Sequence, residues 1–291
     1  MRGTLGFLSG SQSARISIYL EYLMNNSAKA IFFDIDGTLT NHKGGPFKDD
    51  LEAMEKAAGQ GNLLFINTGR SLANIPDTVL NLPLWSGIAA GGGAHVLLKE
   101  SGTAKPLYKT IYHKWVEESF LIDLCAWYLK NRKRIILEGE RDCYVINPNR
   151  EYDKARNLKV INRPEDLFSK YPGDLISKMT IQSSFIRGER ELLGGYFHIN
   201  IFPNYVEAVI KGEDKGKAIG IILDAVGIER KNSIALGDSI NDIDMFRFAG
   251  LGAAMGNADA ETKAAAAFIT KNCGEGGAAE VLRRFVIKLK A

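Results

Sequence analysis

The stretch "IFFDIDGTLT", residues 31–40, runs from three apolar residues into two aspartates and a glycine. The apolar run predicts a buried strand, and Asp34 and Asp36 follow directly at its end. Burying a carboxylate without a partner is costly, so a strand that ends in two aspartates requires a group that neutralises them. The stretch therefore predicts a charged site at the end of a core strand.

Composition excludes several classes of protein. The 291 residues are 45% hydrophobic and 24% charged, which is typical of a globular chain with one large or two medium domains. A net charge of +3 gives no single-sign field that would favour nucleic acid or an anionic membrane. No run approaches the roughly 18 apolar residues of a membrane helix. We therefore expect no nucleic-acid or membrane partner, and leave monomer and homodimer both open.

The three cysteines are odd in number and widely separated, and they contain no CxxC pair. This pattern argues against a disulfide framework or a zinc cluster and is typical of reduced cysteines in a cytoplasmic protein. Residues 1–27 look separate from the rest of the chain, and Met24 offers an alternative start directly before the first clear strand. We treat 1–27 as an extension of uncertain status and exclude it from the fold.

From residue 29 onward, short apolar runs alternate with helical stretches. Strands are predicted at 29–33, 62–70 and 85–93, and the same rhythm returns from 214 to the end. Near-continuous apolar strands of this kind indicate a parallel sheet covered on both faces. The fold class we predict is α/β, with a Rossmann-like, doubly wound parallel sheet as its core, formed by 28–108 and 211–291.

The middle of the chain has a different pattern of predicted helices and strands. A helix is predicted at 113–130, and five strands follow it, joined by turn residues such as Pro148-Asn149 and Pro203-Asn204. Turns of this kind imply hairpins and antiparallel pairing. We therefore expect residues 109–210 to form an α+β domain inserted into the core.

Four polar stretches follow predicted strands or open predicted helices: 34–38, 67–70, 214–216 and 237–242. In a doubly wound sheet, ligands bind beyond the carboxyl ends of the strands. Carboxylates cannot stay ionised at close quarters unless a cation lies among them. The oxygen set of Asp34, Asp36 and Asp238, with no histidine or cysteine in these stretches, favours Mg²⁺. The sequence therefore predicts a Mg²⁺ site, with a phosphate bound to the metal.

The stretches "FFDIDGTLT", "INTGR", "DKGKA" and "GDSINDIDM" match, in order, the four motifs of the haloacid dehalogenase superfamily of phosphohydrolases. The chain most resembles the Cof-type branch, whose α+β cap is inserted between the second and third motifs. The resemblance covers Lys29 to the end of the chain. It implies a Mg²⁺-dependent phosphatase that acts on small phosphorylated metabolites, most plausibly sugar phosphates, through an aspartyl phosphate.

The resemblance also implies a role for each matching residue. Asp34 matches the nucleophile, and Asp36 matches the acid/base whose backbone carbonyl also joins the metal. Thr68 would hydrogen-bond the phosphoryl group and Lys215 would neutralise it. The residues expected to bind substrate are Thr68, Gly69, Arg70 and Lys215, and those expected around the metal are Asp34, Asp36, Asp238, Asn241 and Asp242.

Simpler structural roles compete with some of these assignments. Lys211 and Lys217 are rivals of Lys215 within the same stretch, and Arg70 is equally well interpreted as an exposed arginine at a helix start. Asp238 or Asp242 fits a helix N-cap. Cof-type proteins commonly carry Asn-Gly-Ala after the third strand, whereas this chain has Gly92 in place of the asparagine, which weakens any inference about substrate.

His95 and His198 each stand alone on an apolar run, so we interpret them as core or cleft histidines and not as metal ligands.

Other activities within and beyond the superfamily compete with this interpretation. A dehalogenase is disfavoured because it does not need Asp36. A phosphomutase, or a phosphatase dedicated to sucrose or mannosyl phosphates, shares the same core and cap type and stays open. A non-catalytic regulator that senses phosphate is the rival from a different class, but receiver modules carry no insertion like 109–210.

Overall fold

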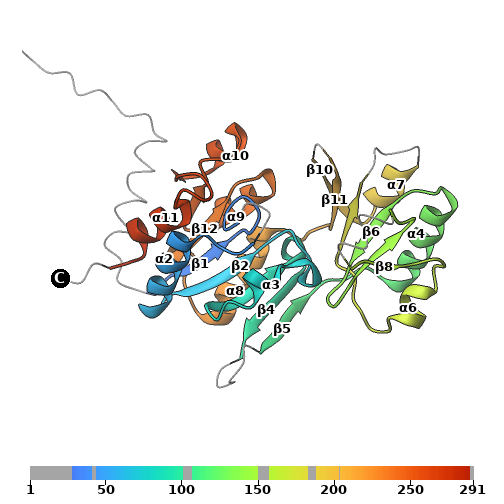
Figure 1. Ribbon diagram of the computed structural model, residues 1–291, viewed down its shortest axis with the longest axis horizontal. Helices are drawn as coiled ribbons and strands as arrows, with labels where there is room; N and C mark the ends of the chain where they lie inside the picture. The colour runs from blue at the N-terminus through green and yellow to red at the C-terminus, as the bar shows by residue number, and fades with distance from the viewer. Residues whose placement is uncertain are drawn as a thin grey trace, which may run out of the picture. The chain divides into compact units, whose positions relative to one another are not determined.

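The computed structural model describes residues 28–40, 44–100, 107–149, 157–182, 188–202 and 204–288. Strands and helices alternate along most of the chain (Figure 1). The chain divides into two compact units. The first comprises the described residues up to Leu64 and from Leu223 onward, and the second comprises those from Phe65 to Ile222.

The larger sheet has eight strands, and its half nearest β14 is parallel. Strand β1 pairs in parallel with β12, from Ala30 opposite Ser233 to Phe33 opposite Leu236. Strand β13 lies parallel to both β12 and β14, whereas β4 is antiparallel to β3 and β5. The order across the sheet is β14 (Phe268–Ile269), β13 (Leu251–Ala254), β12 (Ser233–Gly237), β1 (Ala30–Phe33), β2 (Leu63–Asn67), β3 (Trp85–Ala90), β4 (His95–Lys99), β5 (Tyr108–His113).

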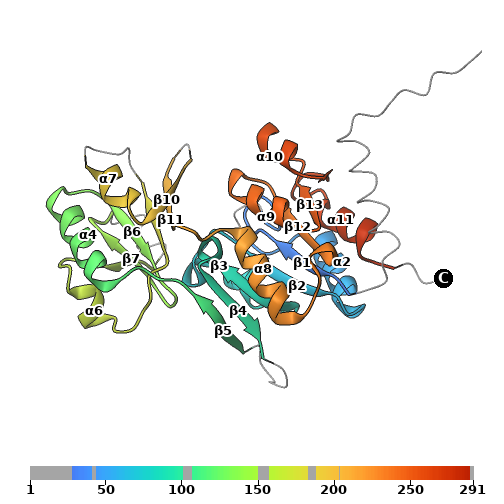
Figure 2. The same ribbon diagram turned by 180° about the vertical axis from the view of Figure 1, so that it is seen from behind.

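The first unit is built around strands that have no exposed face. All four residues of β1 are fully buried, as expected for a sheet covered on both sides. Helices α2 (Lys48–Gly59) and α11 (Gly277–Phe285) lie side by side (Figures 1 and 2). The Asp50 carboxylate of α2 accepts a 2.7 Å hydrogen bond from the Ala279 backbone N–H in the first turn of α11. This bond satisfies one of the unpaired donors at the start of α11. The unit also contains α9 (Ile243–Phe248) and α10 (Ala260–Ala265).

The second unit contains a sheet of six strands. Every neighbouring pair is antiparallel except β7 and β8, which are parallel. Tyr128 of α4 is fully buried in a cluster that includes Leu137 and Tyr144 from two of the strands. The strand order is β10 (Phe197–Ile201), β11 (Val206–Ile210), β9 (Lys178–Ile181), β6 (Ile135–Glu138), β7 (Cys143–Ile146), β8 (Lys159–Val160). Among its described residues, this unit contains the helices α3 (Asp77–Leu80), α4 (Glu118–Lys130), α6 (Asp166–Lys170), α7 (Glu189–Gly194) and α8 (Lys215–Val226), which extends into the first unit.

The predicted fold class is confirmed, and the second sheet is antiparallel as the hairpins indicated. The boundary of one predicted helix is wrong. The helix expected at 113–130 begins at Glu118, because His113 is the last residue of β5, which pairs with β4 in the larger sheet. Strand β5 therefore lies within the expected insertion 109–210 but belongs to the larger sheet, and the smaller sheet begins at Ile135.

The expected extension, residues 1–27, lies outside the described residues. Among the helices of the described part of the chain, none has both the length and the apolar character needed to cross a membrane.

Candidate active site

The first motif turns sharply at the end of β1. Asp34 follows the strand, is only 5% exposed, and donates its backbone N–H to the Leu236 carbonyl of β12 at 2.9 Å. Gly37 has a φ of 81°, a left-handed conformation that glycine adopts without strain. A Cβ on Gly37 would lie 2.2 Å from Oδ2 of Asp238. Gly37 therefore meets two requirements, a positive φ and a close approach to a carboxylate.

The fourth motif forms a tight loop after β12. Oδ2 of Asp242 accepts 2.9 Å hydrogen bonds from the backbone N–H groups of Asp238 and Ser239, in a capping box around a short 3₁₀ turn. The Ser239 hydroxyl also donates to Oδ1 of Asn241 at 2.8 Å. Asp242 therefore has the capping role that its position allowed, and its carboxylate organises the loop that carries Asp238.

Three carboxylates come together where these two loops meet. Asp34, Asp238 and Asp242 each offer an oxygen, and the three oxygens lie within 4.8 Å of one another. A set of carboxylate oxygens without nitrogen or sulfur is the donor set that Mg²⁺ prefers. The residues present therefore fit the expected metal. The side chain of Asp36 is not a member of this group.

The electrostatics of this region are strongly negative. Burial, followed by the charges of Asp238, Asp50 and Asp34, raises the pKa of the Cys273 thiol to about 12. Cys273 is therefore a neutral thiol at physiological pH. A concentration of negative charge that shifts a neighbouring thiol in this direction is the environment in which a divalent cation binds favourably.

Sequence reasoning missed Asn257, which links the two aspartate loops. Its side-chain N–H donates to the Gly37 carbonyl at 2.9 Å, and its Oδ1 accepts from the Cys273 backbone N–H at 2.7 Å. A second, longer contact of 3.4 Å reaches Oδ2 of Asp238. Asn257 follows the carboxyl end of the core strand β13. A polar residue at this position could have indicated a site residue, because ligands bind beyond the carboxyl ends of such strands.

The second unit contains the other expected residues, Thr68, Gly69, Arg70 and Lys215. Thr68 follows β2, is 1% exposed, and its Oγ1 accepts a 3.2 Å hydrogen bond from the Arg70 backbone N–H. The Asn67 side chain donates to the Lys215 carbonyl at 2.9 Å, which ties the end of β2 to the start of α8. The second and third motifs are therefore held together. Nη1 of Arg70 donates to the Asn74 carbonyl at 2.9 Å, which gives Arg70 a role within its own loop.

The three candidate lysines differ in burial. Lys215 is 1% exposed, whereas Lys211 and Lys217 are exposed, and Lys217 forms a 2.9 Å ion pair with Glu213. Asp214 accepts a 2.7 Å hydrogen bond from the Lys217 backbone N–H and so caps α8. A buried lysine at a capped helix start is the more suitable partner for an anion, so Lys215 remains the preferred choice.

Comparison with known proteins gives matches along most of the chain. Residues 31–282 match the family model of haloacid dehalogenase-like hydrolases. A Haemophilus influenzae protein named "Putative phosphatase" is 42% identical over 267 residues, covering 87% of this chain and 97% of the relative. A Bacillus subtilis 5-amino-6-(5-phospho-D-ribitylamino)uracil phosphatase is 28% identical over 284 residues, covering 86% and 96%. Among solved structures, a subclass IIB sugar phosphatase has a TM-score of 0.73 and 28% identity, covering 90% of this chain and 100% of that chain.

The chain therefore belongs to the haloacid dehalogenase-like hydrolase family. Within that family it is a phosphatase.

Proposed function

We propose that the protein is a Mg²⁺-dependent phosphatase that hydrolyses small phosphate monoesters, with sugar phosphates as the substrate class, through an aspartyl phosphate on Asp34. The grouping of Asp34, Asp238 and Asp242 at the ends of β1 and β12 is the observation that carries this proposal. The substrate class is supported by the resemblance to a structure described as a sugar phosphatase.

The chain offers a defined set of ligands for the expected metal. Mg²⁺ would be held by the carboxylates of Asp34 and Asp238 and the backbone carbonyl of Asp36, with Asn241 and Asp242 around them. When bound, the metal would neutralise the charge between the attacking carboxylate and the anionic phosphoryl group. Two hydrogen bonds hold the loops that carry these ligands: the Asn257 side chain donates to the Gly37 carbonyl, and the Asp242 carboxylate accepts from the Asp238 backbone N–H.

In the first half-reaction, a carboxylate oxygen of Asp34 attacks phosphorus and the bond from phosphorus to the ester oxygen breaks. The electron pair stays on the departing oxygen, which takes a proton from the carboxyl group of Asp36. The products are the free alcohol and an aspartyl phosphate on Asp34.

In the second half-reaction, the Asp36 carboxylate removes a proton from water as the water oxygen attacks phosphorus. The bond from phosphorus to Asp34 breaks, which restores the Asp34 carboxylate and releases inorganic phosphate. The Thr68 hydroxyl, the Lys215 ammonium, the loop at Gly69 and the Arg70 guanidinium would bind the phosphoryl oxygens and stabilise their charge in both steps.

The expected insertion, without strand β5, would act as a cap that admits small esters and excludes water during attack. Cys125, Cys143 and Cys273, all within the described residues, form no disulfide, which is consistent with a reducing, cytoplasmic location. The enzyme would work there on small phosphorylated metabolites, as a monomer or a homodimer.

The test is hydrolysis of para-nitrophenyl phosphate, followed by a panel of phosphorylated metabolites, with and without Mg²⁺. We expect turnover that a chelator abolishes and excess Mg²⁺ restores. Asp34→Asn should lower kcat by at least about 1,000-fold, because an amide cannot form the acyl phosphate. Asp244→Asn, on the exposed face of α9, is the matched control and should keep full activity. Folded protein that shows no turnover with Mg²⁺ would favour a non-catalytic, phosphate-sensing role.

A further inference from the structure

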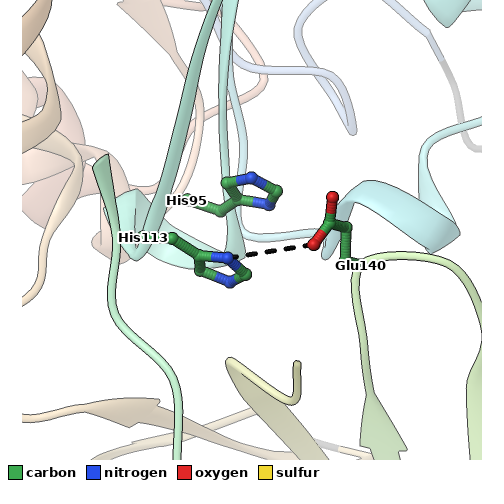
Figure 3. Close-up of side chains that lie close together, drawn as sticks. All are labelled: His95, His113 and Glu140. Atoms are coloured by element: carbon green, nitrogen blue, oxygen red, sulfur yellow. Dashed lines mark ion pairs between the residues drawn. The ribbon is translucent and has the colours of Figure 1, made fainter. Parts of the chain in front are cut away.

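A second group of metal-ligating side chains belongs to the second unit and includes none of the motif aspartates (Figure 3). It consists of His95 on β4, His113 at the end of β5 and Glu140 in the turn between β6 and β7. Each offers one ligand atom, and these atoms lie within 4.8 Å of one another. None of the three residues takes part in the proposed phosphatase mechanism.

Strand pairing brings the two histidines together. His95 is directly opposite His113 in the antiparallel ladder of β4 and β5, and their rings stack at 3.8 Å with only 4° between their planes. Nε2 of His95 is 3.0 Å from the Thr110 hydroxyl, which leaves Nδ1 for another partner and fixes the ring's orientation. His95 is buried, as expected of a core histidine, but it is not isolated in space, because the strand pairing places His113 directly opposite it.

His113 is buried without satisfying hydrogen bonds. Its side chain is 6% exposed, and its Nε2 has no hydrogen-bond partner among the described residues. Its Nδ1 faces Oε2 of Glu140 at 4.0 Å, which is too long for a hydrogen bond. Buried polar nitrogens are normally paired, so an imidazole with neither nitrogen well paired indicates a site for a further partner.

The backbone of Glu140 is held firmly, although its side chain is partly open to solvent. Oδ1 of Asp174 accepts 3.0 Å hydrogen bonds from the backbone N–H groups of both Glu140 and Arg141. A Cβ on Gly139 would lie 2.6 Å from Oδ2 of Asp174, so the turn requires glycine at that position. The Glu140 side chain is 34% exposed, so this carboxylate is accessible to an ion in solvent.

Burial lowers the pKa of both histidines. Burial lowers the pKa of His95 to about 3, with a further contribution in the same direction from the neighbouring His113. Burial lowers the pKa of His113 to about 4, against the opposing charge of Asp174.

We propose that His95, His113 and Glu140 form a second metal site, separate from the Mg²⁺ site, that binds a borderline transition-metal dication of the Zn²⁺ class. Two imidazole nitrogens and one carboxylate oxygen are characteristic Zn²⁺ ligands, with water in the fourth position. Mg²⁺ prefers oxygen ligands alone, so it is a poor competitor at this site.

Binding such an ion requires the ligand atoms to move closer together. Metal–ligand distances of about 2.0–2.2 Å place neighbouring tetrahedral ligand atoms about 3.4 Å apart. The 4.0 Å between Nδ1 of His113 and Oε2 of Glu140 is longer than that value by about 0.6 Å. An imidazole binds a metal in the plane of its ring, so the two stacked rings must turn apart to converge on one ion. A bound ion would tie the turn between β6 and β7 to strands β4 and β5.

The experiment is a titration of the full-length protein, stripped with chelator, with Zn²⁺ and with Co²⁺ in saturating Mg²⁺. We expect one equivalent to bind with a dissociation constant below about 10 μM, a tetrahedral Co²⁺ absorption band, and a higher melting temperature with Zn²⁺. His113→Phe, which keeps a ring stacked on His95, should weaken binding at least tenfold and abolish the band. Glu140→Gln, on an exposed turn, should also weaken binding and provides a test if the histidine variant fails to fold.

Two controls separate this site from other binding. His198→Ala, on the exposed face of β10, should bind like the wild type. Asp34→Asn should also bind the same equivalent, so a failure of the proposed phosphatase mechanism would leave this result unchanged. Absence of stoichiometric binding in folded wild-type protein, or equal affinity in wild type, His113→Phe and Glu140→Gln, would overturn the proposal.

Discussion

Gly37 and Gly237 allow the backbone to pass close to the carboxylates of the aspartate site. A Cβ on Gly37 would lie 2.2 Å from Asp238, and one on Gly237 would lie 2.3 Å from Cγ of Asp242. Gly37 directly follows Asp36, and Gly237 directly precedes Asp238. The two glycines are therefore part of the geometry that groups Asp34, Asp238 and Asp242. The positions of the carboxylates therefore depend on two residues without side chains.

Gly37→Ala tests this dependence, with Gly44→Ala as the matched control. Both glycines have a positive φ, 81° and 98°, so both substitutions incur backbone strain of about 1–3 kcal/mol. A Cβ at Gly44 meets nothing within 4 Å, whereas one at Gly37 displaces Asp238. We expect only Gly37→Ala to raise the Mg²⁺ concentration for half-maximal activity, by about tenfold or more. Equal Mg²⁺ dependence in the two variants would show that strain alone accounts for the effect.

Asp36→Asn tests the acid/base role. The amide keeps the shape and the backbone carbonyl but cannot exchange a proton, so kcat should fall by about two to four orders of magnitude. Protonation of the leaving group and activation of water should both slow. Para-nitrophenyl phosphate has a good leaving group, so the substitution should slow its phosphoryl transfer to Asp34 less. The fall in kcat should persist with this substrate, because activation of water is still impaired. A variant with unchanged kcat and a raised KM would assign Asp36 to binding instead.

At the scale of helices and strands, local pattern predicted most of the core. The strands predicted at 29–33, 62–70 and 85–93 all appear, as Ala30–Phe33, Leu63–Asn67 and Trp85–Ala90. These elements were predictable because hydrophobic period and glycine stops are encoded locally. The same local signals predicted the four strand-end motifs that carry the candidate site.

Features that depend on pairing between distant residues were not predictable. The end of strand β5 was expected to be helical because nothing local shows that His113 is opposite His95. Asn257 was missed because its contact to the Gly37 carbonyl joins residues 220 positions apart in the chain. Register and long-range hydrogen bonds are set by tertiary packing, which overrides local preference.

Three strands of the smaller sheet share a buried ion cluster. Nζ of Lys178 on β9 is 2.6 Å from Oε1 of Glu207 on β11 and 3.7 Å from Oε1 of Glu138 on β6. Burial opposes the charge on Lys178, but Glu138 and Glu207 together raise its pKa above the ordinary value. The lysine is therefore charged and holds two buried carboxylates.

Lys178→Met should leave those carboxylates buried without their cation. Breaking a buried ion pair from one side costs about 3–5 kcal/mol, so the melting temperature should fall by several degrees. Lys48→Met, which removes a lysine that is 91% exposed from a pair with Glu52, is the control and should change the melting temperature little. Adding Glu207→Gln to Lys178→Met should recover part of the loss. A Lys178→Met variant as stable as the wild type would mean that the cluster adds nothing to the stability of the sheet.

At the scale of the whole molecule, the four motifs are divided between the two units. Asp34, Asp36, Asp238, Asn241 and Asp242 belong to the first, and Thr68, Gly69, Arg70 and Lys215 belong to the second. The six-stranded sheet forms all of its ladders internally, and it lies between the second and third motifs in the chain. An insertion that pairs only with itself can vary without altering the strands that carry the motif aspartates, which is how one core serves different substrates.

Removing the insertion tests whether it selects the substrate. The deletion should begin at residue 115 and not at 109, because β5 belongs to the larger sheet. The Lys114 backbone N–H also donates to the Ala94 carbonyl at 2.7 Å. Replacing 115–211 with a short Gly/Ser linker should leave a protein that binds Mg²⁺ through Asp34 and Asp238. Discrimination among esters should collapse, because contacts to the leaving group are lost and water enters freely.

The measurement is kcat/KM for the best sugar phosphate and for para-nitrophenyl phosphate, in the full-length and shortened proteins. In the full-length protein the ratio of the two values should favour the sugar phosphate, and in the shortened protein it should fall toward one. The absolute rate for para-nitrophenyl phosphate should fall less, because a small activated ester depends less on enclosure. A folded shortened protein that binds Mg²⁺ and keeps the full-length ratio would place substrate selection in the loops of the core, because the attacking carboxylate and the metal holders are the same in both proteins.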